Sequence, residues 1–158
     1  EFVVQKTVAE PVLEKTDDML SEALLSVVMK DPPLFKEELQ NIQPGLLDSY
    51  TAGAVAKLVN SGRADVSEML KEFREKEQSY KLEFAYLRSQ ELWKDFKEEE
   101  LKAEFQSLMD KMKKRAISAQ INNLVYDMKE AEAKKDKEKV RELSVKFAEL
   151  INQFPKNV

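Results

Sequence analysis

The 158-residue sequence contains no cysteine and no histidine. Their absence removes thiol nucleophiles, imidazole bases, disulfides and the usual zinc ligands. A chain without cysteine also suits the cytoplasm, where disulfides are rare. Glycine and proline are scarce, with three and five residues, and neither occurs between Asp95 and Phe154. These features favour an all-α fold over one built from strands and turns.

Charge of neither sign predominates. The 26 Lys and Arg residues and the 30 Asp and Glu residues leave a net charge of −4, so bulk electrostatics do not predict binding to nucleic acid or to an anionic membrane. The longest apolar run, near Ala23–Met29, is far too short to span a bilayer. Glu1–Pro11 shows no clear period, and we interpret residues 1–15 as the remnant of a linker to a longer protein.

No motif with a known chemistry is present. The sequence contains neither a Walker-type nor a GxGxxG phosphate loop. Adjacent carboxylates such as Glu98, Glu99 and Glu100 are typical of solvated faces and of first helical turns, where the helix dipole favours negative charge. We therefore expect no catalytic residue, no cofactor, no metal site and no enzymatic activity of this fragment by itself.

The chain is organised around the stretch from Glu98 to about Phe154, which predicts a long helix, a turn near Lys134–Lys137 and a helix that folds back. At about 100° per residue, the apolar residues of the first half of the long helix share one face, and those of its second half share roughly the opposite face. The first set is Leu101, Phe105, Leu108, Met112 and Ala116, and the second is Ile117, Ile121, Leu124 and Met128. A helix whose apolar stripe changes side packs into two separate neighbourhoods. We therefore expect a helical bundle over residues 16–115 joined by the long helix to a two-helix hairpin over 116–158.

Shorter helices are predicted upstream of the long helix, among them Leu46–Val59 and Ser79–Trp93. Trp93 and Phe96 stand at the junction between the last of these and the long helix. Because large aromatic pairs at such junctions usually pack inside, we expect both rings in the core.

The returning helix carries an apolar stripe that is wider than one partner helix can cover. Its members are Val140, Leu143, Phe147, Leu150, Ile151 and Phe154. Tyr126 lies opposite the stripe of the long helix, so a two-helix hairpin cannot bury it. The candidate partner-binding residues are therefore Tyr126, Ile151 and Phe154 as anchors, with Lys134, Lys135 and Lys137 as charges at the rim. Alternatively, Ile151 and Phe154 complete the interior of the hairpin.

A basic cluster lies just before the point at which the apolar stripe of the long helix changes side. It consists of Lys111, Lys113, Lys114 and Arg115. On a helix these side chains point in several directions, which favours a solvated face. A secondary contact to nucleic acid is the alternative, although no interleaved aromatic residues could stack on bases.

Two stretches resemble the C-terminal, helicase-binding domain of bacterial DnaG-type DNA primases, and the resemblance covers about Asp17 to the end. The first is SEALLSVVMKDPPLF (Ser21–Phe35), a leucine-rich helix followed by proline and a Leu-Phe pair. The second is LKAEFQSLMDKMKKRAISAQINNLVYDMKEAEAKKDKEKVRELSVKFAELINQ (Leu101–Gln153), with a long helix, an acidic-alanine stretch, a turn with an Asp, and a final helix with a Phe-x-x-Leu pattern. The turn, AKKDKEK, departs from the many family members that carry a glycine before the Asp.

The resemblance implies a non-catalytic domain that docks primase onto the replicative DnaB-type helicase. It also implies a helical bundle joined by a long helix to a hairpin that carries most of the helicase affinity. The polymerase and zinc-binding domains would lie upstream of Glu1. The N-terminal domain of the helicase itself, which has a similar fold, an unrelated helical adaptor and a nucleic-acid-binding helical domain are the alternatives.

Overall fold

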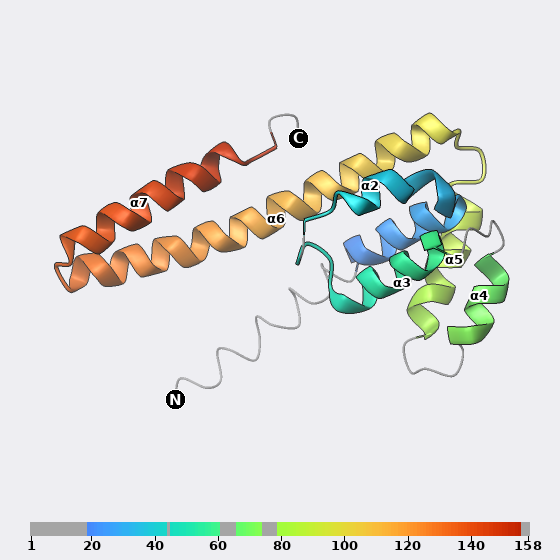
Figure 1. Ribbon diagram of the computed structural model, residues 1–158, viewed down its shortest axis with the longest axis horizontal. Helices are drawn as coiled ribbons and strands as arrows, with labels where there is room; N and C mark the ends of the chain where they lie inside the picture. The colour runs from blue at the N-terminus through green and yellow to red at the C-terminus, as the bar shows by residue number, and fades with distance from the viewer. Residues whose placement is uncertain (1–18, 44, 61–65, 74–78, 156–158) are drawn as a thin grey trace. The chain divides into compact units, whose positions relative to one another are not determined.

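The computed structural model describes residues 19–43, 45–60, 66–73 and 79–155, and every regular element within these ranges is helical (Figure 1). A first helix is described over residues 19–30. The elements that follow are the 3-10 helix η1 (Pro32–Phe35) and the α-helices α2 (Lys36–Gln40), α3 (Ser49–Asn60), α4 (Val66–Phe73), α5 (Ser79–Leu92), α6 (Glu98–Ala133) and α7 (Lys137–Asn152). The all-α expectation is confirmed. The expected linker at residues 1–15 lies outside the described residues.

The chain divides into two compact units, Glu1–Leu108 and Met109–Val158, and the division falls inside α6. The long helix is therefore shared by both units, and it runs without a break from Glu98 to Ala133. The boundary expected from the reversal of the apolar stripe, between residues 115 and 116, lies further along the same helix. One division reflects which residues lie close together in space, and the other reflects the side of the helix on which the apolar residues lie. The two boundaries therefore need not fall at the same residue.

The core of the first unit forms around the helix over residues 19–30. Leu24, Leu25, Val27 and Val28 of this helix are almost fully buried. The ring of Phe35 in η1 is fully buried and stacks on the ring of Phe105 in α6, with centroids 4.9 Å apart. Leu101, Phe105 and Leu108 are all buried, so the first stripe of the long helix faces this core. Burial of such apolar surface is the main term that stabilises the unit.

Polar contacts also connect elements of the first unit. The indole Nε1 of Trp93 donates a hydrogen bond to Ser26 Oγ at 3.0 Å. Arg88 pairs with Glu22 at 3.3 Å, and Lys102 pairs with Glu38 at 3.4 Å. Phe96 packs edge-on against Trp93, with centroids 4.9 Å apart. However, Phe96 is 39% exposed, so it lies at the edge of the core rather than within it.

Helix α3 begins later than Leu46 because Asp48 caps it. The Asp48 carboxylate accepts hydrogen bonds from Thr51 N at 2.9 Å and Thr51 Oγ1 at 2.6 Å, and a third from Ser21 Oγ at 3.2 Å. Burial raises the pKa of Asp48, but these hydrogen bonds and one from the backbone of Tyr50 together lower it by more, so that pKa lies below its ordinary value. An aspartate in this position satisfies amides that the first helical turn leaves unpaired.

No helix in the described part of the chain combines the length and the apolar character that a bilayer span requires.

Candidate partner-binding surface

A single turn connects the two helices of the hairpin in the second unit, ending α6 and starting α7 (Figure 1). Asp136 N donates to Ala131 O at 2.9 Å and Lys135 N donates to Glu132 O at 3.0 Å, which is the Schellman pattern. Lys135 adopts φ 59°, the left-handed conformation that glycine takes without strain. The carboxylate of Asp136 then accepts from Lys139 N at 3.1 Å and caps α7. The turn forms with lysine where many members of the resembled family carry glycine.

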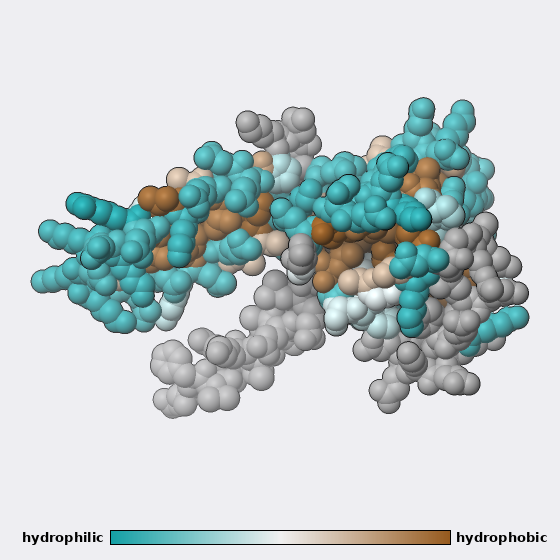
Figure 2. Space-filling model, in the orientation of Figure 1, coloured by the Kyte–Doolittle hydropathy of each residue, from teal (hydrophilic) through white to brown (hydrophobic). Residues whose placement is uncertain are grey.

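The two helices bury little of the stripe between them. Ala131 in α6 and Leu143 in α7 are buried. Of the remaining stripe residues, Ile117 is buried, Ile151 is exposed and the others are half-buried, namely Ile121, Leu124, Met128, Val140, Phe147, Leu150 and Phe154. Figure 2 shows apolar residues along the groove between α6 and α7, edged by hydrophilic ones. A pair of helices lacks the third layer that would cover these side chains.

The groove between the helices opens on two sides of the hairpin. On one side it is lined by Gln120, Asn123, Leu124 and Asp127 of α6 and by Lys146, Glu149, Leu150 and Gln153 of α7. On the other side it is lined by Val125, Met128, Lys129 and Glu132 of α6 and by Phe147 of α7. We call the first side the Asp127 face and the second the Val125 face. Each is a shallow apolar strip with polar margins.

The structure exposes the expected anchors to different degrees. Tyr126 is 66% exposed and Ile151 is 46% exposed, whereas Phe154 is half-buried just after the end of α7. The two exposed anchors do not form one cluster, because Tyr126 projects from the side of α6 that faces away from α7. Ile151 follows Phe147 by one turn and borders the Val125 face. The binding role of all three residues remains a prediction.

The three turn lysines are exposed but differ in their surroundings. Lys134 pairs with Glu130 one turn earlier in α6, at 4.0 Å. Lys135 occupies the left-handed position, and Lys137 is the first residue of α7. An exposed pair of this kind contributes little stability, so these lysines are available as rim charges.

Two exposed valines were not among the predicted anchors. Val125 is 37% exposed and Val145 is 59% exposed. Val125 lines the groove, and its exposure beside the stripe of α6 is the signal that could have identified it. Val145 lies outside the stripe of α7 and lines neither face of the groove.

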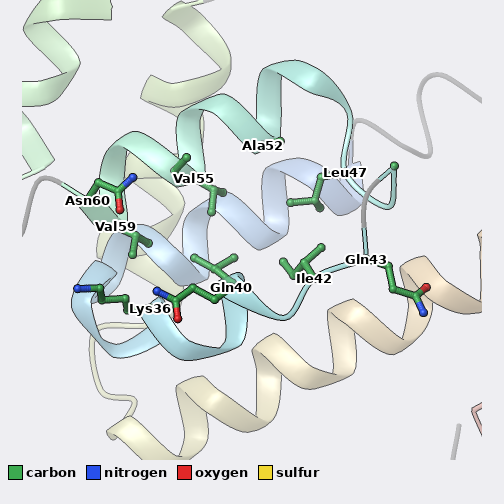
Figure 3. Close-up of a pocket in the computed structure, with 12 residues that line it drawn as sticks. Lys36, Gln40, Ile42, Gln43, Leu47, Ala52, Val55, Val59 and Asn60 are labelled. Carbon is green, nitrogen blue, oxygen red and sulfur yellow. The ribbon is translucent and has the colours of Figure 1, made fainter.

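The first unit contains a second candidate site, an apolar cavity of about 320 Å³ between α2, α3 and the segment that joins them (Figure 3). Its apolar walls include Leu39, Ile42, Leu47, Val55 and Val59, and its polar margin includes Lys36, Gln40, Gln43 and Asn60. Sequence periodicity could not reveal it, because folding brings these residues together from separate segments. On α5, Phe84 and Leu87 are also exposed, at 59% and 60%.

Within the described ranges, no group of three or more acidic residues is arranged to hold a metal ion. No protein-family model matches the sequence, and comparisons with curated proteins and with solved structures found no match either. The functional interpretation therefore depends on the residues and their geometry.

Proposed function

We propose that this chain is a non-catalytic protein-interaction module that docks a DNA primase onto the replicative DnaB-type helicase in the cytoplasm during priming. In this proposal the polymerase chemistry belongs to another part of the primase. The chain itself supplies binding energy and geometry, and it needs no cofactor.

The observation that carries the proposal is the helical hairpin with exposed anchors. Tyr126 and Ile151 stay largely exposed on two helices that leave most of their own stripe half-buried. Large aromatic and aliphatic side chains in such positions dominate the energies of protein interfaces. A third layer supplied by a partner would cover the apolar groove that α6 and α7 leave open.

The organisation of the chain also supports the proposal. The resemblance to primase helicase-binding domains implies a bundle joined by a long helix to a hairpin. Here α6 belongs to both compact units, and α7 returns along its second half. Leu101, Phe105 and Leu108 pack into the first unit, while Ala131 belongs to the hairpin. This agreement supports the architecture of the proposed docking module.

Size-exclusion chromatography of the chain mixed with a hexameric DnaB-type helicase tests the proposal directly. We expect the chain to coelute with the helicase and to elute separately when the helicase is omitted. The helicase with its N-terminal domain removed serves as the control partner and should not retain the chain.

The two proteins are mixed at concentrations well above the Kd of a typical transient complex. If the chain then elutes apart from the intact helicase, the docking role is refuted. A chain that assembles by itself into a ring-sized species would instead favour the alternative of a helicase N-terminal domain.

A further inference from the structure

The exposed apolar side chains of the hairpin are unevenly distributed between its two faces. Val125 lines the Val125 face, and helical spacing places Ile151 next to its lining residue Phe147, one turn further along α7. Both Val125 and Ile151 are exposed. On the Asp127 face the apolar lining residues are Leu124 and Leu150, which are half-buried. Apolar surface that a partner could newly cover is therefore concentrated on the Val125 face.

Helix geometry assigns the remaining residues of α7 to the two faces. Residues spaced seven apart on a helix lie within about 20° of each other, so Lys137 and Ser144 share the side of Ile151. Arg141 lies on the same side, about 80° round the helix from Ile151. Lys139 and Lys146 also form a heptad pair, and Lys146 lines the Asp127 face.

The Val125 face and the Asp127 face also differ in charge. Lys129 and Glu132 line the Val125 face, and helical spacing adds the cations Lys137 and Arg141 to the same side. Asp127, Lys146 and Glu149 line the Asp127 face. Helical spacing adds to its side the cations Lys134 and Lys139 and the carboxylates Glu130 and Glu142. Three cations against one carboxylate make the first face positive, whereas three against four leave the second slightly negative. A chain of net charge −4 thus presents a locally positive surface around exposed apolar residues.

We propose that the Val125 face is the docking side of the hairpin, and that its occupant is a protein surface with an apolar centre and a rim of carboxylates. The inference rests on the proposed function, with that surface belonging to the helicase. Val125 and Ile151 are covered by the apolar centre, and Lys129, Lys137 and Arg141 meet the carboxylates. The Asp127 face remains in solvent in the complex.

The composition of the Val125 face favours a protein over nucleic acid as its occupant. Phe147 is its one aromatic lining residue and is half-buried, whereas the exposed apolar lining residue is the aliphatic Val125. The face therefore presents no exposed ring on which a base could stack. Glu132 lines the face beside Val125 and Lys129, where it would repel a phosphate backbone. Apolar centres with polar rims are typical of protein interfaces.

Matched charge reversals on the two faces test the inference. The first variant carries Lys129→Glu and Arg141→Glu, and the control variant carries Lys139→Glu and Lys146→Glu. All four side chains are exposed on helices, both variants change the net charge equally, and circular dichroism melts verify folding. Stopped-flow mixing with hexameric helicase over a salt series gives the association rate. We expect the first variant to associate about tenfold more slowly at low salt and the control within about twofold of the unmodified chain.

A second pair of variants tests the apolar centre. Ile151→Ser should raise the Kd for the helicase by about tenfold, mainly through faster dissociation. Val145→Ser removes a comparably exposed aliphatic side chain from the outer side of α7 and should leave the Kd within about twofold.

The outcomes separate the inference from the function on which it rests. An unmodified chain that fails to bind helicase overturns both. Binding that weakens equally with both charge variants, or more with the control, overturns the inference and leaves the docking role standing. A labelled single-stranded oligonucleotide is titrated in parallel. If it loses affinity with the Lys129→Glu, Arg141→Glu variant while helicase binding is unchanged, the face is a nucleic-acid site and the inference is overturned.

Discussion

The rings of Phe35 and Phe105 stack with their centroids 4.9 Å apart and 24° between their planes. Both side chains are almost fully buried. The contact joins η1, which follows the first helix, to the first half of α6, which the chain reaches much later. It is therefore a long-range contact that fixes the long helix in the core of the first unit.

Phe105→Ala should lower the free energy of unfolding by about 3–5 kcal/mol, because it removes a buried ring and leaves a cavity beside Phe35. The leucine of Phe105→Leu fills most of that space, so this variant should lower the free energy of unfolding by clearly less. Chemical denaturation monitored by circular dichroism measures both values. Equal losses for the two variants would show that the site does not depend on ring volume.

The Asp48 cap predicts a pH-dependent term in stability. The folded pKa of Asp48 lies below its ordinary value of 3.8, so the carboxylate stabilises the fold fully above that value. The stabilisation is lost as the pH falls through the folded pKa. Asp48→Asn keeps a capping oxygen but has no charge. It should be less stable than the unmodified chain at about pH 7, and the difference should shrink as the pH falls through the folded pKa of Asp48. Urea unfolding at several pH values measures the difference, and a gap that does not narrow in acid would contradict the role of the charge.

Lys135→Gly should stabilise the hairpin. A side chain in the left-handed region strains the backbone, and glycine relieves that strain while adding some entropy to the unfolded chain. We expect a net gain of about 0.5–1 kcal/mol. Lys135→Ala removes the same charge but keeps the strain, so it should be close to neutral. If the alanine variant gains as much as the glycine variant, charge rather than backbone conformation explains the effect.

Tyr126→Ala should separate binding from folding. Because Tyr126 is 66% exposed, its removal should leave the melting curve nearly unchanged, while helicase binding weakens by more than about 1 kcal/mol if the ring is an anchor. Phe147→Ala is the contrasting variant. Phe147 is half-buried, so its loss should cost about 2 kcal/mol of stability, less than the value for a fully buried ring. Calorimetric titration and thermal melts of both variants provide the comparison, and unchanged binding by Tyr126→Ala would remove this residue from the interface.

Several features of the hairpin followed from the sequence alone. The absence of Gly and Pro between Asp95 and Phe154 predicted an uninterrupted long helix, and the structure confirms it for Glu98–Ala133. The spacing of apolar residues predicted the exposure of Tyr126. The Lys-Lys-Asp turn was predicted near Lys134–Lys137, and it forms at Lys134–Asp136. These features are local, because helical period and turn preference depend on residues close together in the chain.

Tertiary structure decided the rest. Only folding brought Phe35 to Phe105 and placed Ser26 beside Trp93, and it left Phe96 partly exposed at the edge of the core. The cavity between α2 and α3 and the difference between the Val125 and Asp127 faces likewise required the packed helices. A periodic pattern states which residues share a face of one helix, but it does not state which other helix covers that face or how completely. That information lies in contacts between residues far apart in the chain, and it is what distinguishes a buried stripe from a surface left open for a partner.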